Sequence, residues 1–326
     1  MESRAGAVTI VIPTHNRRPF LEEAVASAVA QGPAVARVVV VNDGSEDDTA
    51  TWLDRLNAPL VTAVHVHPAA GGAAARNRGF GLCRTPYVMF LDDDDVLRQG
   101  AIDRLLAALE RHPRAAGAAG AGHRFGAPTD RPRTIHPRWP TTRPVWKEVL
   151  FCWGMYPAAL LWRTAVVADL GGWSEDLRRF EDRDLVLRAY PRPFALIPDT
   201  VADLRVHPGQ VTNVAHEELD WRLRDAFVAR LDPADRRAGA AIVAAARGFE
   251  PALESYRRGD PSPLTAVLRR ALAPDTTLLR SPILAPWLAG LAVKAGLLPA
   301  VPPALARTVR EARRSARHRL HQKSTR

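Results

Sequence analysis

The chain is poor in cysteine, with only Cys83 and Cys152 among its 326 residues. Two cysteines exclude the multi-disulfide framework of small secreted domains, and neither has the Cys-x-x-Cys spacing of a structural zinc site. No Gly-x-Gly-x-x-Gly follows the first apolar run, which disfavours a dinucleotide-binding protein. No internal repeat is evident. These absences favour a globular, non-repetitive protein of a reducing compartment.

The chain also lacks a long uncharged apolar run. Residues 278–298 are apolar, but charged residues and prolines interrupt them before the stretch of about 18 residues that a membrane-spanning helix needs. The interrupting residues are Arg280, Pro282, Pro286 and Lys294. We therefore predict buried or interfacial helices here. The first residues carry no apolar segment of the kind found in signal peptides, so we expect a cytoplasmic protein.

The positive charge is confined to one part of the chain. Residues 1–214 hold 25 basic and 24 acidic side chains, whereas residues 215–326 hold 20 basic and 11 acidic ones. Residues 307–326 alone carry eight basic residues against one glutamate, and they predict a basic helix or arm. A tail of this kind suits peripheral contact with an anionic membrane at its inner face better than nucleic-acid binding.

Strand-like and helix-like segments alternate through most of the chain. In order, we predict strand 8–12, helix 20–30, strand 38–41, helix 47–56, strand 61–65, helix 73–82, strand 87–91, helix 101–111, strand 116–122, helix 181–189, strand 194–197 and helices 221–231 and 238–246. Such alternation predicts an α/β fold with βαβ units and a parallel sheet. A helical extension follows the α/β part.

Residues 90–97 read FLDDDDVL, with four consecutive aspartates after a predicted strand. Carboxylates about 4 Å apart repel by about 4 kcal/mol near a protein surface, so a fold that gathers them is expected to supply a cation. If the strand continues, Asp92 and Asp94 share a face, and one can bind a ribose hydroxyl and the other a divalent metal. The alternative is structural, with Asp94 or Asp95 as the N-cap of the next helix.

Polar clusters also follow the first two predicted strands. They are Thr14-His15-Asn16 and Asn42-Asp43-Gly44. Because ligands of open α/β sheets bind beyond the carboxyl ends of strands, we expect these clusters and the aspartates to line one crevice. Asp43 suits a ribose or base, whereas the structural alternative is a turn with Ser45 as a helix cap. Arg76 offers guanidinium donors to a base or phosphate, unless it lies on a solvated helix face.

Six segments occur together in a recognisable order: VTIVIPTHNR, VVVVNDGSEDDT, GGAAARNRGF, FLDDDDVL, LGGWSEDLRRFEDRDLVLR and LRVHPGQVTN. The chain resembles family 2 glycosyltransferases over about residues 7–214. The resemblance implies a GT-A type, Rossmann-like fold with a mixed, mostly parallel sheet flanked by helices. It implies a catalytic domain over 1–214, divided into a nucleotide-binding half (1–112) and an acceptor half (113–214), before a helical extension (215–306) and the basic tail (307–326).

The resemblance also implies roles for individual residues. The nucleotide is expected to contact Pro13, Thr14, Asn16, Asp43, Arg76, Asp92 and Asp93, with His15 in the same turn. Asp94 matches the metal-binding end of the family's DxD motif, and His207 resembles a histidine that completes the metal site in some members. Glu181 and Asp182 match the acidic pair that supplies the general base, with Asp182 as the base. Without the resemblance, residues 181–184 read as a surface ion-pair helix.

The predicted function is therefore an inverting transfer of a sugar from a nucleoside diphosphate sugar to an acceptor hydroxyl, assisted by Mn²⁺ or Mg²⁺. A lipid-linked or cell-envelope saccharide fits the basic tail as the acceptor, and a polysaccharide, a protein and a small metabolite are the alternatives. One alternative is a sugar nucleotidyltransferase, although PTHNRR is not the glycine-rich loop of those enzymes. The other is a non-catalytic binding protein whose basic C-terminus contacts a membrane or nucleic acid.

Overall fold

The computed structural model of the protein describes residues 4–126, 133–137, 146–150, 154–207 and 217–247. The chain divides into two units between His216 and Glu217. The predictions for the apolar segment 278–298 and the basic tail 307–326 fall outside the described residues. The finer domain limits expected from the sequence stay predictions.

The first unit alternates strands and helices as the sequence predicts. Its first half contains β1 (Val8–Thr14), α1 (Arg18–Val29), β2 (Val35–Asp43), α2 (Thr49–Arg55), β3 (Val61–Val66), α3 (Gly72–Phe80), β4 (Tyr87–Phe90), β5 (Val96–Leu97) and α4 (Ala101–Arg111). Its second half contains β6 (Gly117–Phe125), β7 (Arg133–Ile135), α5 (Trp146–Val149), η1 (Pro157–Ala159), β8 (Leu160–Arg163), α6 (Thr164–Asp169), α7 (Glu181–Arg188) and β9 (Ala195–Arg205).

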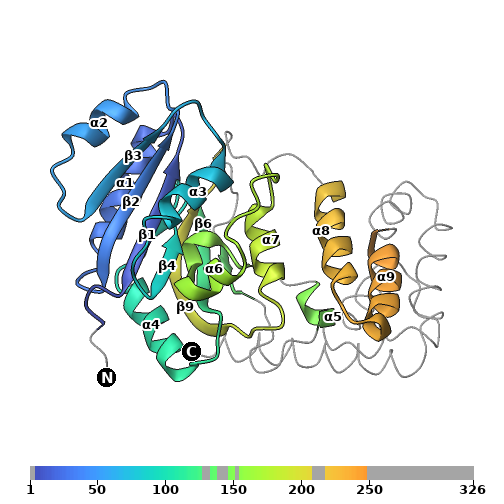
Figure 1. Ribbon diagram of the computed structural model, residues 1–326. Coiled ribbons are helices and arrows are strands. Elements are labelled where there is room, and N and C mark those ends of the chain that lie inside the picture. The colour runs from blue at the N-terminus through green and yellow to red at the C-terminus, as the bar shows by residue number, and fades with distance from the viewer. Residues whose placement is uncertain (1–3, 127–132, 138–145, 151–153, 208–216, 248–326) are drawn as a thin grey trace. The chain divides into compact units, whose positions relative to one another are not determined.

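A single mixed sheet holds the described strands in the order β3-β2-β1-β4-β8-β6-β9-β5, with β7 paired to β6 (Figure 1). Strands β1 to β4 are mutually parallel, and β6 is parallel to β9. Antiparallel pairings join β8 to its two neighbours and β5 and β7 to the sheet. Most paired residues lie in parallel pairings, so the prediction of a mixed, mostly parallel sheet is confirmed.

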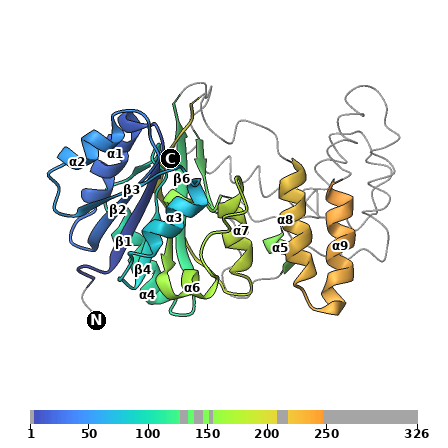
Figure 2. The same ribbon diagram turned by 45° about the horizontal axis from the view of Figure 1, so that its top comes forward.

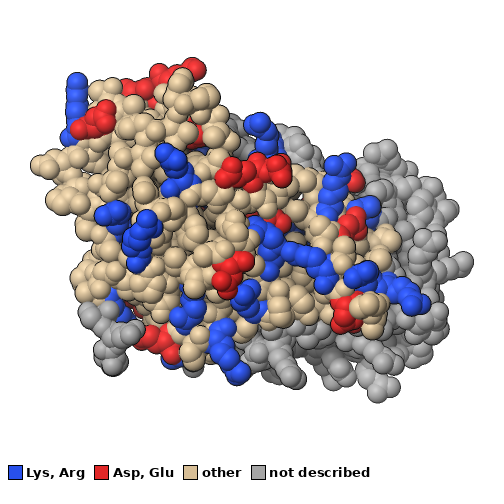
Figure 3. Space-filling model, in the orientation of Figure 1, with Lys and Arg blue, Asp and Glu red and all other residues tan. Residues whose placement is uncertain are grey.

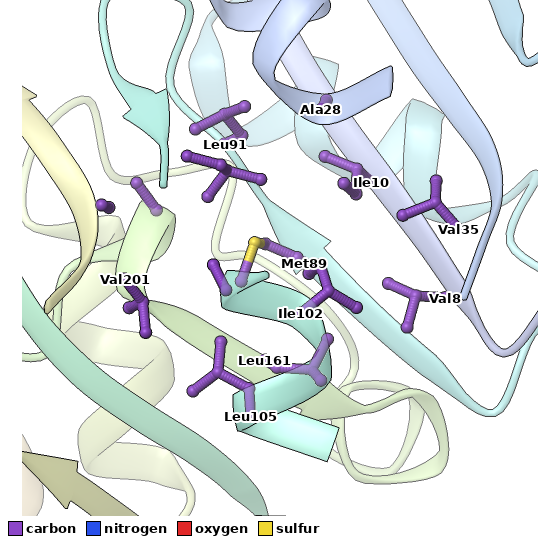
Figure 4. Packing of buried hydrophobic residues seen from close by; sticks show 14 of the residues in the cluster. Val8, Ile10, Ala28, Val35, Met89, Leu91, Ile102, Leu105, Leu161 and Val201 are labelled. Atoms are coloured by element: carbon purple, nitrogen blue, oxygen red, sulfur yellow. The ribbon is translucent and has the colours of Figure 1, made fainter. Parts of the chain in front are cut away.

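The central strand β1 is buried along its whole length because helices cover both faces of the sheet. Val8 and Ile10 point to the face where α1 and α4 pack, and there they join Met89, Ile102 and other apolar side chains (Figure 4). On the opposite face Val11 lies under α3, which Figure 2 shows beside the strands from a second direction. The strand alternation thus directs the two helical layers to opposite faces.

Gly79 allows α3 to approach the sheet closely. A Cβ at this position would overlap Val11 Cγ1 and lie 3.1 Å from Val41 Cγ2. Gly79→Ala is therefore expected to lower the free energy of unfolding by about 1–3 kcal/mol, although alanine favours helices over glycine. Gly81→Ala is the control, since its Cβ would meet only carbonyl oxygens at 3.4 and 3.6 Å. Chemical denaturation of both variants tests the difference, and equal stability of the two would contradict it.

Six elements have no counterpart in the sequence prediction: β5, β7, α5, η1, β8 and α6. They span only two to six residues each, too few to carry a hydrophobic period. Strand β6 is Ala- and Gly-rich because the neighbouring strand β9 crowds it. A Cβ on Gly120 would lie 2.7 Å from Val201, and one on Gly122 would lie 2.5 Å from Leu204.

The described part of the second unit contains α8 (Glu217–Ala229) and α9 (Pro233–Arg247), which confirms both predicted helices there. The two helices pack against each other, and Trp221 lies beneath the guanidinium groups of Arg224 and Arg247, 5.1 and 5.8 Å from them. In the portion of the chain that the structure describes, no helix combines the length and apolarity needed to cross a bilayer.

Candidate active site

The four aspartates form a turn rather than an extension of β4. The strand ends at Phe90, and the backbone N–H of Asp95 donates to the carbonyl of Asp92 at 3.1 Å. The expectation that Asp92 and Asp94 share a strand face is therefore wrong. The turn points them at different partners, and three of the four side chains are buried, leaving only Asp92 partly exposed.

Asp92 pairs with Arg76, which reaches it from α3. Arg76 Nη2 donates to Asp92 Oδ1 at 2.5 Å, and Nη1 donates to Glu181 Oε1 at 3.0 Å. The guanidinium also lies over the ring of Trp173, 4.7 Å from its centroid. Burial lowers the pKa of Arg76, but the two carboxylates more than offset this and raise it above its ordinary value. A permanently charged, buried arginine therefore bridges the aspartate turn and α7.

Asp93 lies beneath the end of β1. Thr14 Oγ1 donates to Asp93 Oδ2 at 2.8 Å, and Arg17 Nη1 donates to Asp93 Oδ1 at 3.2 Å. Burial raises the pKa of Asp93 to about 6, against the opposing charge of Arg17 and with a further increase from Asp94. The expected grouping of Thr14 with Asp93 is thus present in the structure.

Asp94 faces His207, which follows β9. His207 Nε2 lies 3.0 Å from Asp94 Oδ2, and Arg17 Nη1 donates to the same oxygen at 3.2 Å. Within the described residues, no group of three or more His, Cys, Asp or Glu side chains is arranged to hold a metal. Magnesium, however, commonly takes one or two protein carboxylates and completes its coordination with substrate phosphates. The carboxylate and imidazole of Asp94 and His207 fit a divalent metal of that kind.

Asp95 is not a helix cap, and neither is Asp94. Helix α4 begins at Ala101, six residues beyond Asp95, and Gly100 is its N-cap. Instead, Asp95 Oδ1 accepts the backbone N–H of Arg205 at 2.9 Å and so ties the turn to β9. Burial raises the pKa of Asp95 well above its usual range, and the charges of Asp92 and Asp94 raise it further. Its role is structural.

The turn after β1 is held by Asn16, which has a left-handed backbone with φ 56°. Its Oδ1 accepts the N–H of Glu46 at 2.7 Å, and its own N–H donates to Ser45 Oγ at 2.9 Å. Ser45 is thus not the cap of α2, which begins at Thr49. His15 Nδ1 lies 2.7 Å from the carbonyl oxygen of Asp43. These contacts join the ends of β1 and β2.

Asp43 connects β2 to the segment that leads into α3. Its two carboxylate oxygens accept the backbone N–H groups of Ala70 and Gly71, each at 2.7 Å. The side chain is buried, but each oxygen keeps a second lone pair for a ligand hydroxyl. Pro13 lies inside β1, paired with Val41. The nucleotide contacts expected of Asp43 and Pro13 stay predictions.

Helix α7 begins with the acidic pair. Phe180, which precedes it, has an unusual positive φ of 57°, a conformation that non-glycine residues adopt at a cost. The ion pair within α7 is Asp184 with Arg188, at 2.7 Å, whereas Glu181 turns to Arg76. The first turn of α7 is therefore not a surface ion-pair helix. Glu181 and Asp182 instead lie in the group that includes Asp92 and Arg76.

Asp182 is the carboxylate of that turn proposed from the sequence as the base, and its pKa is raised. Burial raises the pKa of Asp182 to about 6, and the charge of the adjacent Glu181 raises it further. The backbone N–H of Arg183 donates to Asp182 Oδ1 at 2.7 Å and opposes the shift. The result is a carboxylate that is mostly ionised at pH 7 yet binds a proton more readily than an ordinary aspartate.

Comparison with known proteins gives a family match for the part of the chain that carries the aspartate turn. Residues 9–165 match the family described as glycosyl transferase family 2. The chain thus carries a segment, 157 of its 326 residues, that matches glycosyl transferase family 2. The matched range covers β1 to β8 and the aspartate turn, and the resemblance expected from the six segments is confirmed.

Curated relatives of this glycosyltransferase vary in how much of their length it spans. It is 24% identical over 243 residues to the uncharacterized glycosyltransferase EpsJ of Bacillus subtilis, covering 69% of this chain and 68% of EpsJ. It is 31% identical over 239 residues to the pre-mycofactocin glycosyltransferase of Mycobacterium tuberculosis, covering 68% of this chain and 45% of that one. Succinoglycan biosynthesis protein ExoO of Rhizobium meliloti is 36% identical over 114 residues, 35% of this chain and 31% of ExoO.

The fold of the glycosyltransferase matches that of solved structures. S. aureus TarS 1–349 in complex with UDP-GlcNAc superposes with a TM-score of 0.60 and 18% sequence identity, over 95% of this chain and 92% of TarS 1–349. At that identity the likeness establishes the fold. The predicted GT-A type fold is therefore confirmed.

The sequence prediction missed three residues of the site: Arg17, Trp173 and Arg205. Arg205 Nε donates to the carbonyl of Asp94 at 3.1 Å, and Asn77 Oδ1 fixes the backbone N–H of Trp173 at 2.8 Å. All three lie inside the segments that carry the family resemblance. Their position within those segments is the only sign in the sequence that they belong to the site, because their partners are distant in the chain.

Charge on the surface is otherwise mixed. Figure 3 shows acidic and basic side chains interspersed over the face that it draws. This agrees with the near balance of 25 basic and 24 acidic residues in the first 214. The concentration of acids at the aspartate turn is therefore a local property, balanced by Arg17 and Arg76.

Proposed function

We propose that the protein is an inverting glycosyltransferase that moves a sugar from a nucleoside diphosphate sugar to an acceptor hydroxyl. The Arg76 bridge carries the proposal, because it places Asp92, expected at the ribose, beside Glu181 of the acidic pair. The match of residues 9–165 to family 2 supports glycosyl transfer over nucleotidyl transfer. The complex of TarS with UDP-GlcNAc supports a nucleotide sugar as donor.

Asp182 is the proposed general base. In an inverting transfer, the acceptor oxygen bonds to the anomeric carbon while the bond from that carbon to the diphosphate breaks, and the acceptor proton passes to a carboxylate. A pKa of about 6 suits this task, since Asp182 is mostly charged at pH 7 and holds the proton once it is transferred. The charge of Glu181, which pairs with Arg76, raises the pKa of Asp182 and so contributes to its basicity.

Six residues at or just after the ends of three neighbouring strands, together with Arg76 of α3, are proposed to hold the nucleotide. The six are Pro13, Thr14, Asn16, Asp43, Asp92 and Asp93. The sheet order β2-β1-β4 supports this assignment, because it places the ends of these strands side by side, where open α/β sheets bind their ligands.

Asp94 and His207 are proposed to hold a divalent metal, Mn²⁺ or Mg²⁺. When bound, such a metal neutralises charge that develops on the leaving diphosphate. The chain itself brings further positive charge to this region through Arg17 and Arg76.

The acceptor is proposed to be a lipid-linked or other cell-envelope saccharide. The name of ExoO, a succinoglycan biosynthesis protein, supports a saccharide acceptor. A cytoplasmic location, with the basic tail 307–326 against the inner face of the cell membrane, is part of the proposal. The proposal also includes a catalytic domain over 1–214, with halves 1–112 and 113–214, and a helical extension over 215–306.

The function is tested with a panel of UDP, GDP and dTDP sugars. Each sugar nucleotide is incubated with the protein and Mn²⁺, with and without EDTA, and the release of nucleoside diphosphate identifies the donor. When no acceptor is known, hydrolysis of the donor by water is measured instead. We expect one nucleotide class to be turned over only with metal and to raise the melting temperature. No turnover and no thermal shift with any member of the panel would favour the non-catalytic binding protein.

The pH dependence of the rate reports on Asp182. Because the base must be ionised and its pKa is raised to about 6, the rate at saturating donor is expected to rise as the pH increases through about 6. An ordinary aspartate would place this rise near pH 4. Asp93 titrates in the same range, so nucleotide affinity is measured separately at pH 5 and 7. A rate that is constant from pH 5 to 8 would contradict the assignment.

A further inference from the structure

Arg17 is the cation that lies between two buried aspartates. Its Nη1 donates to Asp93 Oδ1 and to Asp94 Oδ2, both at 3.2 Å. These aspartates are only 5% and 8% exposed, and their charges are adjacent in the chain. Buried like charges need a compensating cation to remain ionised together. In the described structure Arg17 supplies positive charge to both.

The geometry of these contacts allows Arg17 to exchange its partners. One nitrogen serves both carboxylates at 3.2 Å, which is longer than the roughly 2.7–2.9 Å of strong charge-assisted hydrogen bonds. Arg98, by contrast, donates to Asp203 from two nitrogens, and its Nη2 lies 2.7 Å from Asp203 Oδ1. The Arg17 side chain is also 26% exposed. It can therefore turn away from the aspartates while its backbone stays at the start of α1.

Arg17 occupies an oxygen that the proposed metal site needs. Asp94 Oδ2 accepts from Arg17 Nη1 and also lies 3.0 Å from His207 Nε2. The metal proposed at Asp94 and His207 would share that oxygen with a guanidinium. Two cations at one carboxylate oxygen repel each other, so Arg17 and the metal compete for Asp94.

We propose that Arg17 is an exchangeable cation. In the ligand-free protein it neutralises Asp93 and Asp94, and it moves to the diphosphate of the donor when a divalent metal binds Asp94 and His207. A guanidinium that leaves a carboxylate is well suited to phosphate oxygens, which match its planar set of donors. The inference rests on the proposed function and assigns to Arg17 a role that the family resemblance did not supply.

The two halves of this exchange predict effects of opposite sign for Arg17→Ala. Affinity for Mn²⁺ alone, measured by electron paramagnetic resonance of free Mn²⁺, is expected to rise about tenfold because the competitor is removed. Affinity for nucleoside diphosphate at saturating Mn²⁺ is expected to fall about tenfold to a hundredfold, because a charge-assisted contact is lost. UDP, GDP and dTDP are each tried, and the one that most raises the wild-type melting temperature is used.

Arg18→Ala is the matched control. Arg18 is adjacent to Arg17, but it pairs with Glu22 and Asp48. The affinities of Arg18→Ala for Mn²⁺ and for the nucleoside diphosphate are expected to remain within about twofold of wild type, because an exposed ion pair contributes little. Arg17→Gln, which keeps a neutral donor for the buried aspartates, is expected to show the same two shifts as Arg17→Ala and serves if the alanine variant does not fold.

The outcomes separate this inference from the function on which it rests. A wild-type protein that binds neither Mn²⁺ nor any of the nucleotides overturns the metal-assisted function and the role of Arg17 together. A wild-type protein that binds both, with Arg17 variants whose Mn²⁺ affinity is unchanged or weaker, overturns the exchange alone. A nucleotide affinity that is unchanged in those variants likewise rejects the move of Arg17 to the diphosphate.

Discussion

Asp182→Asn is expected to lower the transfer rate by about 10²- to 10⁴-fold while nucleotide affinity stays unchanged. The substitution keeps the shape of the side chain but removes the carboxylate that accepts the acceptor proton. Asparagine at this position can still accept the N–H of Arg183, which Asp182 Oδ1 now accepts at 2.7 Å, so α7 is expected to keep its start. Rate measurement with the identified donor and thermal shifts with its nucleotide separate the two effects.

Asp176→Asn is the control for this result. Asp176 lies in the same acidic segment, between Trp173 and α7, but its side chain is exposed. We expect its rate to stay within about twofold of wild type, as is usual for surface substitutions. An Asp182→Asn enzyme with normal turnover would assign the base to another carboxylate, and Glu181 would be examined next.

Asp94→Ala is expected to abolish metal-dependent binding of the nucleotide. The substitution removes the carboxylate half of the Asp94–His207 pair, and His207 alone is a weak ligand for Mg²⁺ or Mn²⁺, which prefer oxygen. We expect the nucleotide affinity in the presence of Mn²⁺ to fall by about 10²-fold. Titration of the nucleotide with Mn²⁺ and with EDTA measures this loss, and the two conditions are expected to give the same affinity in the variant.

Asp48→Asn provides an acidic control outside the site, because Asp48 is exposed and pairs with Arg18. The nucleotide affinity of Asp48→Asn is expected to keep its full dependence on Mn²⁺.

Replacement of Asp94 and replacement of Arg17 are expected to change Mn²⁺ affinity in opposite directions. Metal-dependent binding that survives in Asp94→Ala would refute the metal role of Asp94.

The sequence predicted most elements of the first unit because each has a strong local signal. Strands β1 and β2 are near-continuous apolar runs, as expected of strands that helices cover on both faces. Helix α4 has the limits predicted from its apolar spacing, Ala101–Arg111. The same reasoning failed for FLDDDDVL, where strand alternation was extended past Phe90 although the chain turns there.

The partners of the aspartates could not be predicted, because they come from distant parts of the chain. Arg76 and Glu181 are 105 residues apart, and Asp94 and His207 are 113 apart. No local period relates residues at such separations. The family motifs named most of these residues, but they did not indicate that Arg76 spans two acids or that Arg17 touches Asp94.

The sequence by itself determined the alternation of strands and helices, the family, and the residue types at the ends of the strands. Those properties follow from local periodicity and from motifs that are contiguous in the chain. Only the tertiary structure decided how the four aspartates are neutralised: Arg76 binds Asp92, Arg17 lies between Asp93 and Asp94, and β9 supplies a backbone N–H to Asp95. The reason is that charge compensation depends on distance in space, which the order of strands in the sheet sets.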